Sequence, residues 1–291
     1  MKNIFKFIIL IIDSAYALVI TFIKYIKDLF FGRIGEIQDN KRNNEIIIMG
    51  NGPSLKQINF QLINRNAYRF CCVNYYPVKN EFFFILKPEY LCLIDPAFYD
   101  FTIKAEEENF KTLLQNLERV DWKLKIIAPN GKKINVSNPN VSYAWINTNT
   151  ITYDICCIEK WFLYNKNLAN SGMQNVVLAA MYYFLMTNFK KIFICGVDFS
   201  DFKSLYVDEN NRIYVDSTHS YGTTRYYFDE IPEYGFSELY KLLGAYQKMF
   251  LEASKVKQYA NYKKIEIINL SQQSYIDSFR KEHPSVLENF P

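Results

Sequence analysis

The stretch IIIMGNGPSL, residues 46 to 55, guides the interpretation of the whole chain. Its three β-branched isoleucines follow a polar segment, which predicts a buried strand. Gly50 and Gly52 allow the backbone to turn sharply and to approach a ligand closely. Pro53 suits the first turn of a helix, and the free N–H groups of a helix N-terminus bind anions. We therefore expect either a nucleotide or phosphate site here or an ordinary tight turn between a strand and a helix.

The glycine pattern differs from that of dinucleotide-binding enzymes. Leu55 stands where their third glycine would be. The next apolar run, YRFCCVN, ends at Asn74, where a nicotinamide enzyme would have an acidic residue for the ribose diol. A dinucleotide is therefore not expected. The pattern favours a mononucleotide that contacts the side chains of Asn51 and Asn74.

Strand-like and helix-like runs alternate after residue 44. We expect strands in EIIIMG, YRFCCVN, EYLCLID, LKIIAP, VSYAWIN, KIFICGVD and KIEIINL. We expect helices in FTIKAEEENFKTLLQNLERV, in GMQNVVLAAMYYFLMTNF, from about 236 to 257 and at the end of the chain. This order predicts an α/β fold with a Rossmann-like, mostly parallel sheet and helices on both faces. Ligands of such sheets bind beyond the carboxyl ends of the strands, where Asn51, Asn74, Asp95, Asp198 and Ser200 stand.

Composition divides the chain into five parts. Residues 1–33 are hydrophobic, 34–44 form a polar linker, 45–199 form the nucleotide-binding core, and 236–291 complete that core. The segment 200–235 is a long polar insertion, and insertions of this length are usually functional or disordered. Its five tyrosines between residues 206 and 227 argue against disorder, so we interpret it as a lid over the active site.

The N-terminal part is apolar for almost thirty residues, interrupted by Lys6, Asp13, Lys24 and Lys27. Residues 4–23 are long enough to span a bilayer, but a charge near the middle is unfavourable in hydrocarbon. Three interpretations stay open: a helix that lies on the membrane, a single span, and a helix packed on the protein itself. Basic residues on either side suit an anionic cytoplasmic leaflet, and no cleavage site for a signal peptide follows. We expect membrane association.

Charge and cysteine content argue against two classes of protein. A net charge of +4 without a compact basic stripe argues against a nucleic-acid partner. The six cysteines form no C-x-x-C pair, and the chain has only two histidines, which argues against a zinc site. Buried free thiols in a reducing compartment are the simplest interpretation.

Two segments carry candidate chemistry on the core. Asn170, Ser171 and Gly172 precede an apolar helix, so they predict a helix cap that either seats a phosphate or carboxylate or only caps the helix. In CGVDFSDF, Gly196 and Asp198 follow a strand. The second carboxylate comes three residues later, which suits a turn that hydrogen-bonds its own backbone as well as it suits a ligand.

His219 lies within the predicted lid, in DSTHSYGTT. A histidine in a polar loop is either a solvated surface residue or a general base, which must titrate near neutrality within reach of a hydroxyl. The neighbouring tyrosines favour the second interpretation: Tyr206, Tyr221, Tyr226 and Tyr227. His283, near the C-terminus, is expected at the surface.

These motifs together resemble the family 42 bacterial sialyltransferases and, more distantly, flagellin-modifying transferases with a similar core. The resemblance rests on GNGPSL, the asparagine after the second strand, NSGM, CGVDF, a lid with tyrosine and histidine, and KIEIINLSQQSYIDSF. It covers about residues 45–284. It implies a single-Rossmann, GT-A-like glycosyltransferase that needs no metal or other cofactor. Such an enzyme transfers sialic acid or a related nonulosonic acid, with inversion, from a CMP-sugar to a hydroxyl of a surface glycan or glycolipid.

The N-terminal membrane segment lies outside the resemblance. It would place such an enzyme at the cytoplasmic face of the bacterial inner membrane, where lipopolysaccharide, lipooligosaccharide or capsule is assembled. Together with the topology of the sheet, the resemblance also implies a set of residues. The implied donor-binding residues are Gly50, Asn51, Gly52, Asn74, Asp95, Asn170, Ser171, Gly172, Gly196, Asp198 and Ser200. The implied catalytic residues are His219 as base, Tyr206 as the group that hydrogen-bonds the departing phosphate, and Tyr221.

The sequence departs from the family pattern at two positions. Ser200 stands where the family has a second phosphate-binding tyrosine, and Tyr221 or Tyr226 is its candidate replacement. Thr223 occupies the place of the family's base, the last histidine of an H-Y-I-G-H-like stretch, and His219 matches the earlier histidine. Asp95 falls where the family has an asparagine.

These departures leave alternatives open. One is a catalytically silent nucleotide- or glycan-binding protein that kept the fold. Another is a transferase with a different nucleotide-activated donor, such as a pterin diphosphokinase related in fold, which would need a metal. The sequence identifies neither the acceptor, the linkage nor the CMP-activated acid, and it leaves homo-oligomerisation open.

Overall fold

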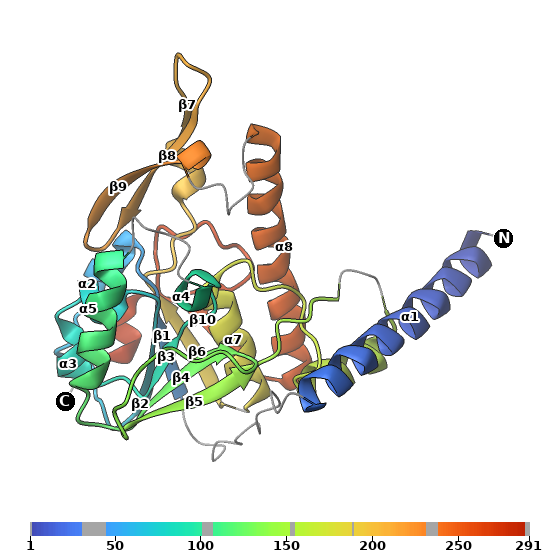
Figure 1. The fold of residues 1–291 in the computed structure, drawn as a ribbon, viewed down its shortest axis with the longest axis horizontal. Helices are drawn as coiled ribbons and strands as arrows, with labels where there is room; N and C mark the ends of the chain where they lie inside the picture. The colour runs from blue at the N-terminus through green and yellow to red at the C-terminus, as the bar shows by residue number, and fades with distance from the viewer. Residues whose placement is uncertain are drawn as a thin grey trace.

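The computed structural model describes residues 2–30, 45–100, 107–151, 155–187, 189–230 and 238–288. The predicted linker 34–44 and the last part of the predicted lid, 231–235, lie outside the described residues. Figure 1 shows a main sheet with helices on both sides, a small projecting sheet and a long N-terminal helix at the edge of the molecule.

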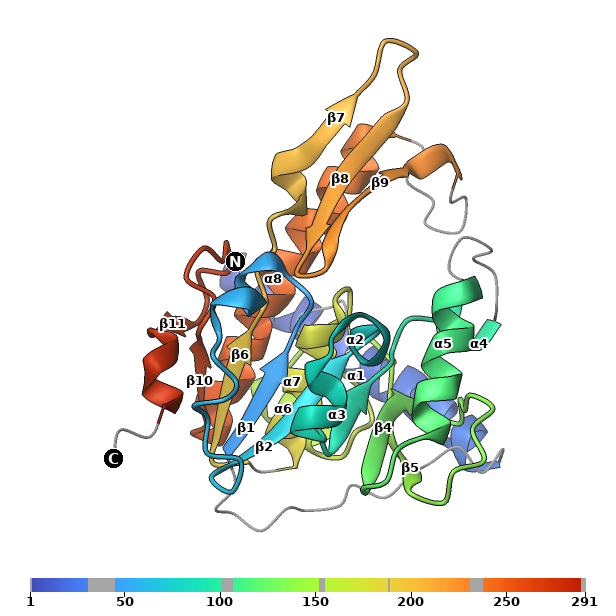
Figure 2. The same ribbon diagram turned by 90° about the vertical axis from the view of Figure 1, so that its left-hand side faces the viewer.

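The main sheet has eight strands in the spatial order β11-β10-β6-β1-β2-β3-β4-β5, and every neighbouring pair is parallel. This confirms the predicted α/β fold class, and Figure 2 shows the strands nearly side by side. The strands are β1 (Glu45–Met49), β2 (Tyr68–Val73), β3 (Tyr90–Cys92), β4 (Leu124–Pro129), β5 (Val141–Ile146), β6 (Lys191–Cys195), β10 (Glu266–Asn269) and β11 (Arg280–Lys281).

Both faces of the sheet are buried, which explains why β1 is continuously apolar from Ile46 to Met49 rather than alternating. Ile46 and Ile48 face one apolar cluster, whereas Ile47 and Met49 face the other. The first cluster includes residues of α6 (Cys157–Asn165), α7 (Val176–Met186) and α8 (Leu239–Lys263). The second includes residues of α2 (Tyr76–Lys79), α3 (Phe82–Leu86), α4 (Ala97–Asp100) and α5 (Glu107–Glu118).

The described part of the predicted lid contains a small sheet, which the sequence did not predict. Its strands β7 (Leu205–Val207), β8 (Ile213–His219) and β9 (Gly222–Tyr227) are antiparallel, in the order β7-β8-β9. The physical reason is a period of two along β8. Ile213 and Val215 point into a small apolar cluster with Leu242 of α8, and Tyr214 between them points to the other side. Figure 1 shows this sheet projecting beyond the main sheet, next to the N-terminal end of α8.

Two predicted helix boundaries and one predicted helix were wrong. α7 begins at Val176, capped by the Asn175 side chain, and not at residues 170–172, because Gly172 has a non-helical φ of 129°. α8 continues to Lys263, beyond the predicted end. The end of the chain holds β11 and a 3-10 turn, Pro284–Leu287, in place of a helix.

The N-terminal hydrophobic segment is one continuous helix, α1 (Lys2–Phe30). Within it, Ile4–Lys27 is long and apolar enough to cross a membrane by length and composition, although only 11% of its most apolar part is buried. Figure 1 shows one end of α1 beside the body and the N-terminal end directed away from it.

Candidate active site

The candidate site lies where the direction of the strand order reverses. β1 pairs with β2 on one side and with β6 on the other, so the loops that follow β1 and β6 leave the sheet in different directions. Nucleotides bind at such a switch point, beyond the carboxyl ends of the strands. GNGPSL follows β1 and CGVDF ends β6, so the two motifs meet at this point.

The glycines at this junction let two backbones come close together. The N–H of Gly50 donates to the Cys195 carbonyl at 2.8 Å, and the N–H of Gly52 donates to the Gly196 carbonyl at 2.8 Å. A Cβ atom on Gly50 would lie 2.3 Å from the Gly196 oxygen. Gly196 has a φ of 64°, which favours glycine. These glycines were expected to let the backbone approach a ligand. In the structure they let the loops after β1 and β6 approach each other.

A carboxylate takes the place predicted for an anion at the helix start. The Asp198 Oδ2 accepts a 3.0 Å hydrogen bond from the N–H of Ser54, in the 3-10 turn Pro53–Gln57. A Cβ on Gly52 would lie 2.2 Å from the same oxygen. Asp198 is 5% exposed, and among the described residues its Oδ1 has no hydrogen-bond partner. The N–H of Ser54 is therefore already hydrogen-bonded to a carboxylate. The turn presents a free acceptor oxygen instead of an anion-binding site.

Three more polar residues follow neighbouring strands at the same edge. Asn51 donates through Nδ2 to the Val73 carbonyl at 3.3 Å. Asn74, after β2, has a φ of 49°, and its buried Oδ1 has no hydrogen-bond partner among the described residues. Asp95, after β3, accepts from the N–H of Ala97 at 2.9 Å and so caps α4. The edge thus offers unpaired acceptor oxygens, which suit the hydroxyl and amino groups of a nucleoside.

The tip of the β8–β9 hairpin touches this edge. The N–H of Ser220 donates to the Asn51 carbonyl at 2.7 Å. Ser220 and Tyr221 form the turn of the hairpin, between His219 and Gly222, which pair across it. Figure 2 shows the hairpin reaching down to the carboxyl end of the main sheet. His219 and Tyr221 therefore lie at the hairpin end that contacts the loop after β1.

His219 belongs to a hydrogen-bonded relay. Its Nε2 lies 3.3 Å from the Ser217 hydroxyl oxygen, and the Ser217 hydroxyl lies 3.1 Å from Asp201 Oδ1. Burial raises the pKa of the Asp201 carboxyl, while the Ser217 hydrogen bond and the nearby His219 act in the opposite direction. A carboxylate linked to a histidine orients the ring and stabilises its protonated form, which is what a general base needs.

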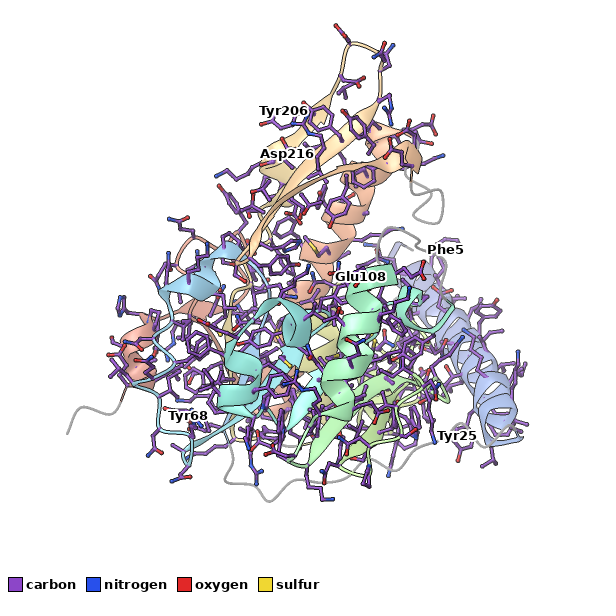
Figure 3. The ribbon with its side chains drawn as sticks, turned by 60° about the vertical axis from the view of Figure 1, so that its left-hand side comes forward. Phe5, Tyr25, Tyr68, Glu108, Tyr206 and Asp216 are labelled. Atoms are coloured by element: carbon purple, nitrogen blue, oxygen red, sulfur yellow. The ribbon has the colours of Figure 1, made fainter. Side chains whose placement is uncertain are left out.

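The structure does not bring Tyr206 to this edge. Tyr206 pairs with Tyr214 across β7 and β8, and the rings stack at 5.3 Å. Tyr214 and His219 are five residues apart on β8, so their side chains point to opposite faces of the small sheet. Figure 3 shows Tyr206 high on the projecting sheet, near Asp216, which pairs with Arg225.

Tyr221 and Tyr226, the two candidate replacements for the missing phenol, lie in different places on the hairpin. The Tyr221 ring stacks on His219 at 5.0 Å, and the Lys79 ammonium lies 5.8 Å from the centre of the Tyr221 ring. Tyr226 packs against the apolar cluster shared with α8. Ser200 lies two residues after Asp198 in the loop that follows β6, and it precedes the 3-10 turn Asp201–Ser204. Of the two candidate replacements for the missing phenol, Tyr221 is the one at the hairpin tip.

The segment 170–174 is held by side chains within the protein. Asn170 is fully buried, and its Oδ1 accepts from the N–H of Gly172 at 2.8 Å while its Nδ2 donates to the Asn147 carbonyl at 2.7 Å. Ser171 is also buried, at 3% exposure. The predicted helix-capping role is therefore wrong for these residues, because they shape the loop before α7.

Sequence reasoning missed a buried glutamate beside this loop. Glu252 of α8 is 7% exposed, and its Oε2 accepts from the N–H of Gln174 at 3.0 Å. A Cβ on Gly172 would lie 2.0 Å from Oε1 of the same side chain, so the glycine makes room for it. Burial raises the pKa of Glu252 to about 7. The only sequence signal is a charged residue on the apolar side of a helix.

Comparisons with known proteins give a distant likeness. No known family profile matches the sequence, and no curated protein matches it. Among solved structures, the chain is similar to the monofunctional α-2,3-sialyltransferase Cst-I from Campylobacter jejuni, with 16% identity, a TM-score of 0.47, and 89% of this chain and 86% of that chain covered. It is similar to the sialyltransferase CstII from Campylobacter jejuni in complex with CMP-3FNeuAc, with 14% identity, a TM-score of 0.44, and 85% and 89% covered.

Proposed function

We propose that the protein is an inverting glycosyltransferase that moves sialic acid or a related nonulosonic acid from a CMP donor to a hydroxyl of a bacterial surface glycan. His219 is the base, and no metal takes part. The observation that carries the proposal is the 2.7 Å hydrogen bond from Ser220 to Asn51, because it joins a histidine relay to the switch point of a parallel sheet.

The donor side of the proposal rests on the acceptor oxygens of the edge. The Oδ1 atoms of Asn74 and Asp198 are buried, and neither has a partner among the described residues. A buried acceptor without a donor destabilises the folded protein, so a ligand that supplies donors to these atoms is favoured. The amino group of cytosine and the hydroxyls of ribose are such donors.

The chemistry follows from the position of the relay. His219 takes the proton of the acceptor hydroxyl, and the oxygen attacks the anomeric carbon of the donor as the bond to phosphate breaks. CMP leaves with the electron pair, so negative charge grows on its phosphate. The Tyr221 hydroxyl and the Lys79 ammonium are the donors at the hairpin tip that suit this charge. Asp201 stabilises the imidazolium that forms.

The test is release of CMP from CMP-sialic acid by the detergent-solubilised full chain in EDTA, with and without bacterial glycolipid. We expect release that the acceptor stimulates. A strict need for a divalent metal would point to a different nucleotide-dependent transferase. CMP-Kdo and other CMP-activated acids in parallel identify the donor.

The second candidate is a silent nucleotide- or glycan-binding protein. Two carboxylates favour it, since Asp198 and Glu252 accept from the N–H groups of Ser54 and Gln174, where a phosphate would otherwise bind. The missing tyrosine at Ser200 and the missing histidine at Thr223 also favour it. This candidate predicts CMP binding by calorimetry with no release from any donor.

A further inference from the structure

Helix α1 has a narrow polar stripe that is fastened to the catalytic body. The Ser14 hydroxyl oxygen accepts from the backbone N–H of Cys156 at 3.0 Å. Lys24 donates to the Asn149 side chain at 2.5 Å, and the same side chain donates to the Thr21 hydroxyl at 3.4 Å. Ala17, between them, is 5% exposed and belongs to the main core. The spacing 14, 17, 21 and 24 places all four residues on one side of the helix.

The opposite side of α1 is apolar and exposed. Successive residues of a helix turn by about 100°, so the exposed apolar side chains of α1 spread over an arc of roughly 200°, with its middle roughly opposite the docked stripe. Six of them lie 48–67% exposed: Phe5, Ile8, Ile12, Val19, Phe22 and Ile26. Figure 1 shows the N-terminal part of α1 extending away from the body. An apolar surface of this size on a soluble protein marks an interaction site.

The docked stripe argues against a helix that spans the bilayer. Ser14 to Lys24 extends for about 15 Å along the axis, and this section is hydrogen-bonded to polar atoms of the body. The described part of the helix before Ser14, residues 2–13, extends for only about 18 Å, whereas the hydrocarbon core of a bilayer is about 30 Å thick. A span would therefore have to break the contacts of Ser14, Thr21 and Lys24.

The width of the apolar face selects a bilayer over a helical partner. A coiled-coil partner covers a narrow seam of two positions in seven, whereas the exposed side chains here cover a much wider arc. A wide apolar face with lysines at its polar side is typical of helices that lie in the membrane interface. Lys6 and Lys27 are both exposed, and Lys27 lies at the edge of the apolar face.

We propose that α1 lies parallel to an anionic bilayer with the face of Phe5, Ile12 and Phe22 in the acyl chains. The opposite stripe then holds the catalytic body on the aqueous side, close to the lipid head groups. This surface is defined without reference to the catalytic site. It can therefore be tested whether or not the protein transfers a sugar.

The experiment is flotation of the full chain with vesicles of phosphatidylcholine and phosphatidylglycerol. We expect wild type to bind, and Phe22→Asp and Ile12→Asp each to bind at least tenfold more weakly with unchanged circular dichroism. The matched control is Leu243→Asp, which makes the same kind of change at a 50% exposed position of α8 and should bind like wild type. Two positions are used so that a folding defect in one does not decide the result.

Extraction with alkaline carbonate distinguishes the two membrane arrangements, because it releases interfacial helices and leaves spanning helices in the bilayer. We expect wild type to be released. Retention after carbonate would overturn the proposal in favour of a span. No flotation, together with a dimer that Phe22→Asp dissociates in size-exclusion chromatography, would overturn it in favour of a second copy of the chain.

Discussion

Two regions meet at the candidate site, and they are held in very different ways. At the β1–β6 junction, glycines without room for a Cβ interlock two loops between buried strands. The described part of the β7–β9 sheet reaches the same site through a backbone hydrogen bond at its tip, the hydrogen bond from Ser217 to Asp201, and a small cluster around Ile213, Val215, Phe228 and Leu242. The difference teaches that the proposed nucleotide site belongs to a rigid part of the molecule. The proposed base, in contrast, sits on an element with few buried contacts, which favours local opening.

The largest expected effect is on the weakly held side. His219→Ala should lower acceptor-stimulated CMP release by about 10²- to 10⁴-fold, because a general base contributes that much, and should leave the melting temperature nearly unchanged. His283→Ala is the matched control and should keep full turnover. That histidine only caps the 3-10 turn Pro284–Leu287, where its side chain accepts from the N–H of Ser285. If His219→Ala releases CMP as fast as wild type, His219 is not the base.

The next effect is on the rigid side. Gly50→Ala should lower the free energy of unfolding by about 3 kcal/mol, because the new Cβ would lie 2.3 Å from a backbone oxygen that cannot move away. Gly244→Ala is the control: nothing lies within 4 Å of its Cβ position in α8, and alanine favours a helix by about 0.5–1 kcal/mol. Urea denaturation measures both. Equal stability of Gly50→Ala and wild type would show that the junction is not interlocked.

A smaller effect is expected within the relay. Asp201→Asn should lower turnover about tenfold, about 1.4 kcal/mol in activation free energy, and move the acidic limb of the pH–rate profile to lower pH. The reason is that the amide no longer favours the protonated imidazole across the Ser217 bridge. Ser217→Ala should shift the same limb. If Asp201→Asn lowers the maximal rate but leaves the acidic limb of the pH–rate profile at the same pH, Asp201 only supports the loop.

The smallest effect concerns Glu252, which links α8 to the loop before α7. Burial raises its pKa from 4.5 to about 7, and Lys248 and Lys255 oppose this rise. Because the folded state holds the proton more tightly than the unfolded state, the contribution of Glu252 to stability falls as pH rises from about 4.5 through about 7. The free energy of unfolding of Glu252→Gln should therefore exceed that of wild type by about 1 kcal/mol at pH 8 and equal it at pH 4. Thermal unfolding at both values checks this, and an equal difference at the two pH values would contradict it.

The main sheet was predictable because its strands are short apolar runs separated by helical patterns, as in EIIIMG and KIFICGVD. The small sheet was not, because the alternation that begins with Ile213 and Val215 is obscured by the aromatic Tyr214 on the outward side and by the polar Ser217 on the inward side.

The site was predictable only in part, for reasons of distance along the chain. Residues after strands, such as Asn51 and Asn74, follow from topology alone. Asp198 on Ser54 joins positions 144 residues apart, and Glu252 on Gln174 joins positions 78 apart. Asp201 was seen in the sequence as a second carboxylate, but its link to His219 needs the β8 strand to place Ser217 between them.

The central claim is that the glycine turn and the hairpin tip form one nucleotide site. Hydrogen–deuterium exchange of the full chain with and without CMP tests it most directly. The account predicts slower exchange on CMP addition both at residues 50–55 and at residues 217–223, because the nucleotide joins the two segments. Protection of residues 50–55 alone, or of neither segment, would contradict the shared site.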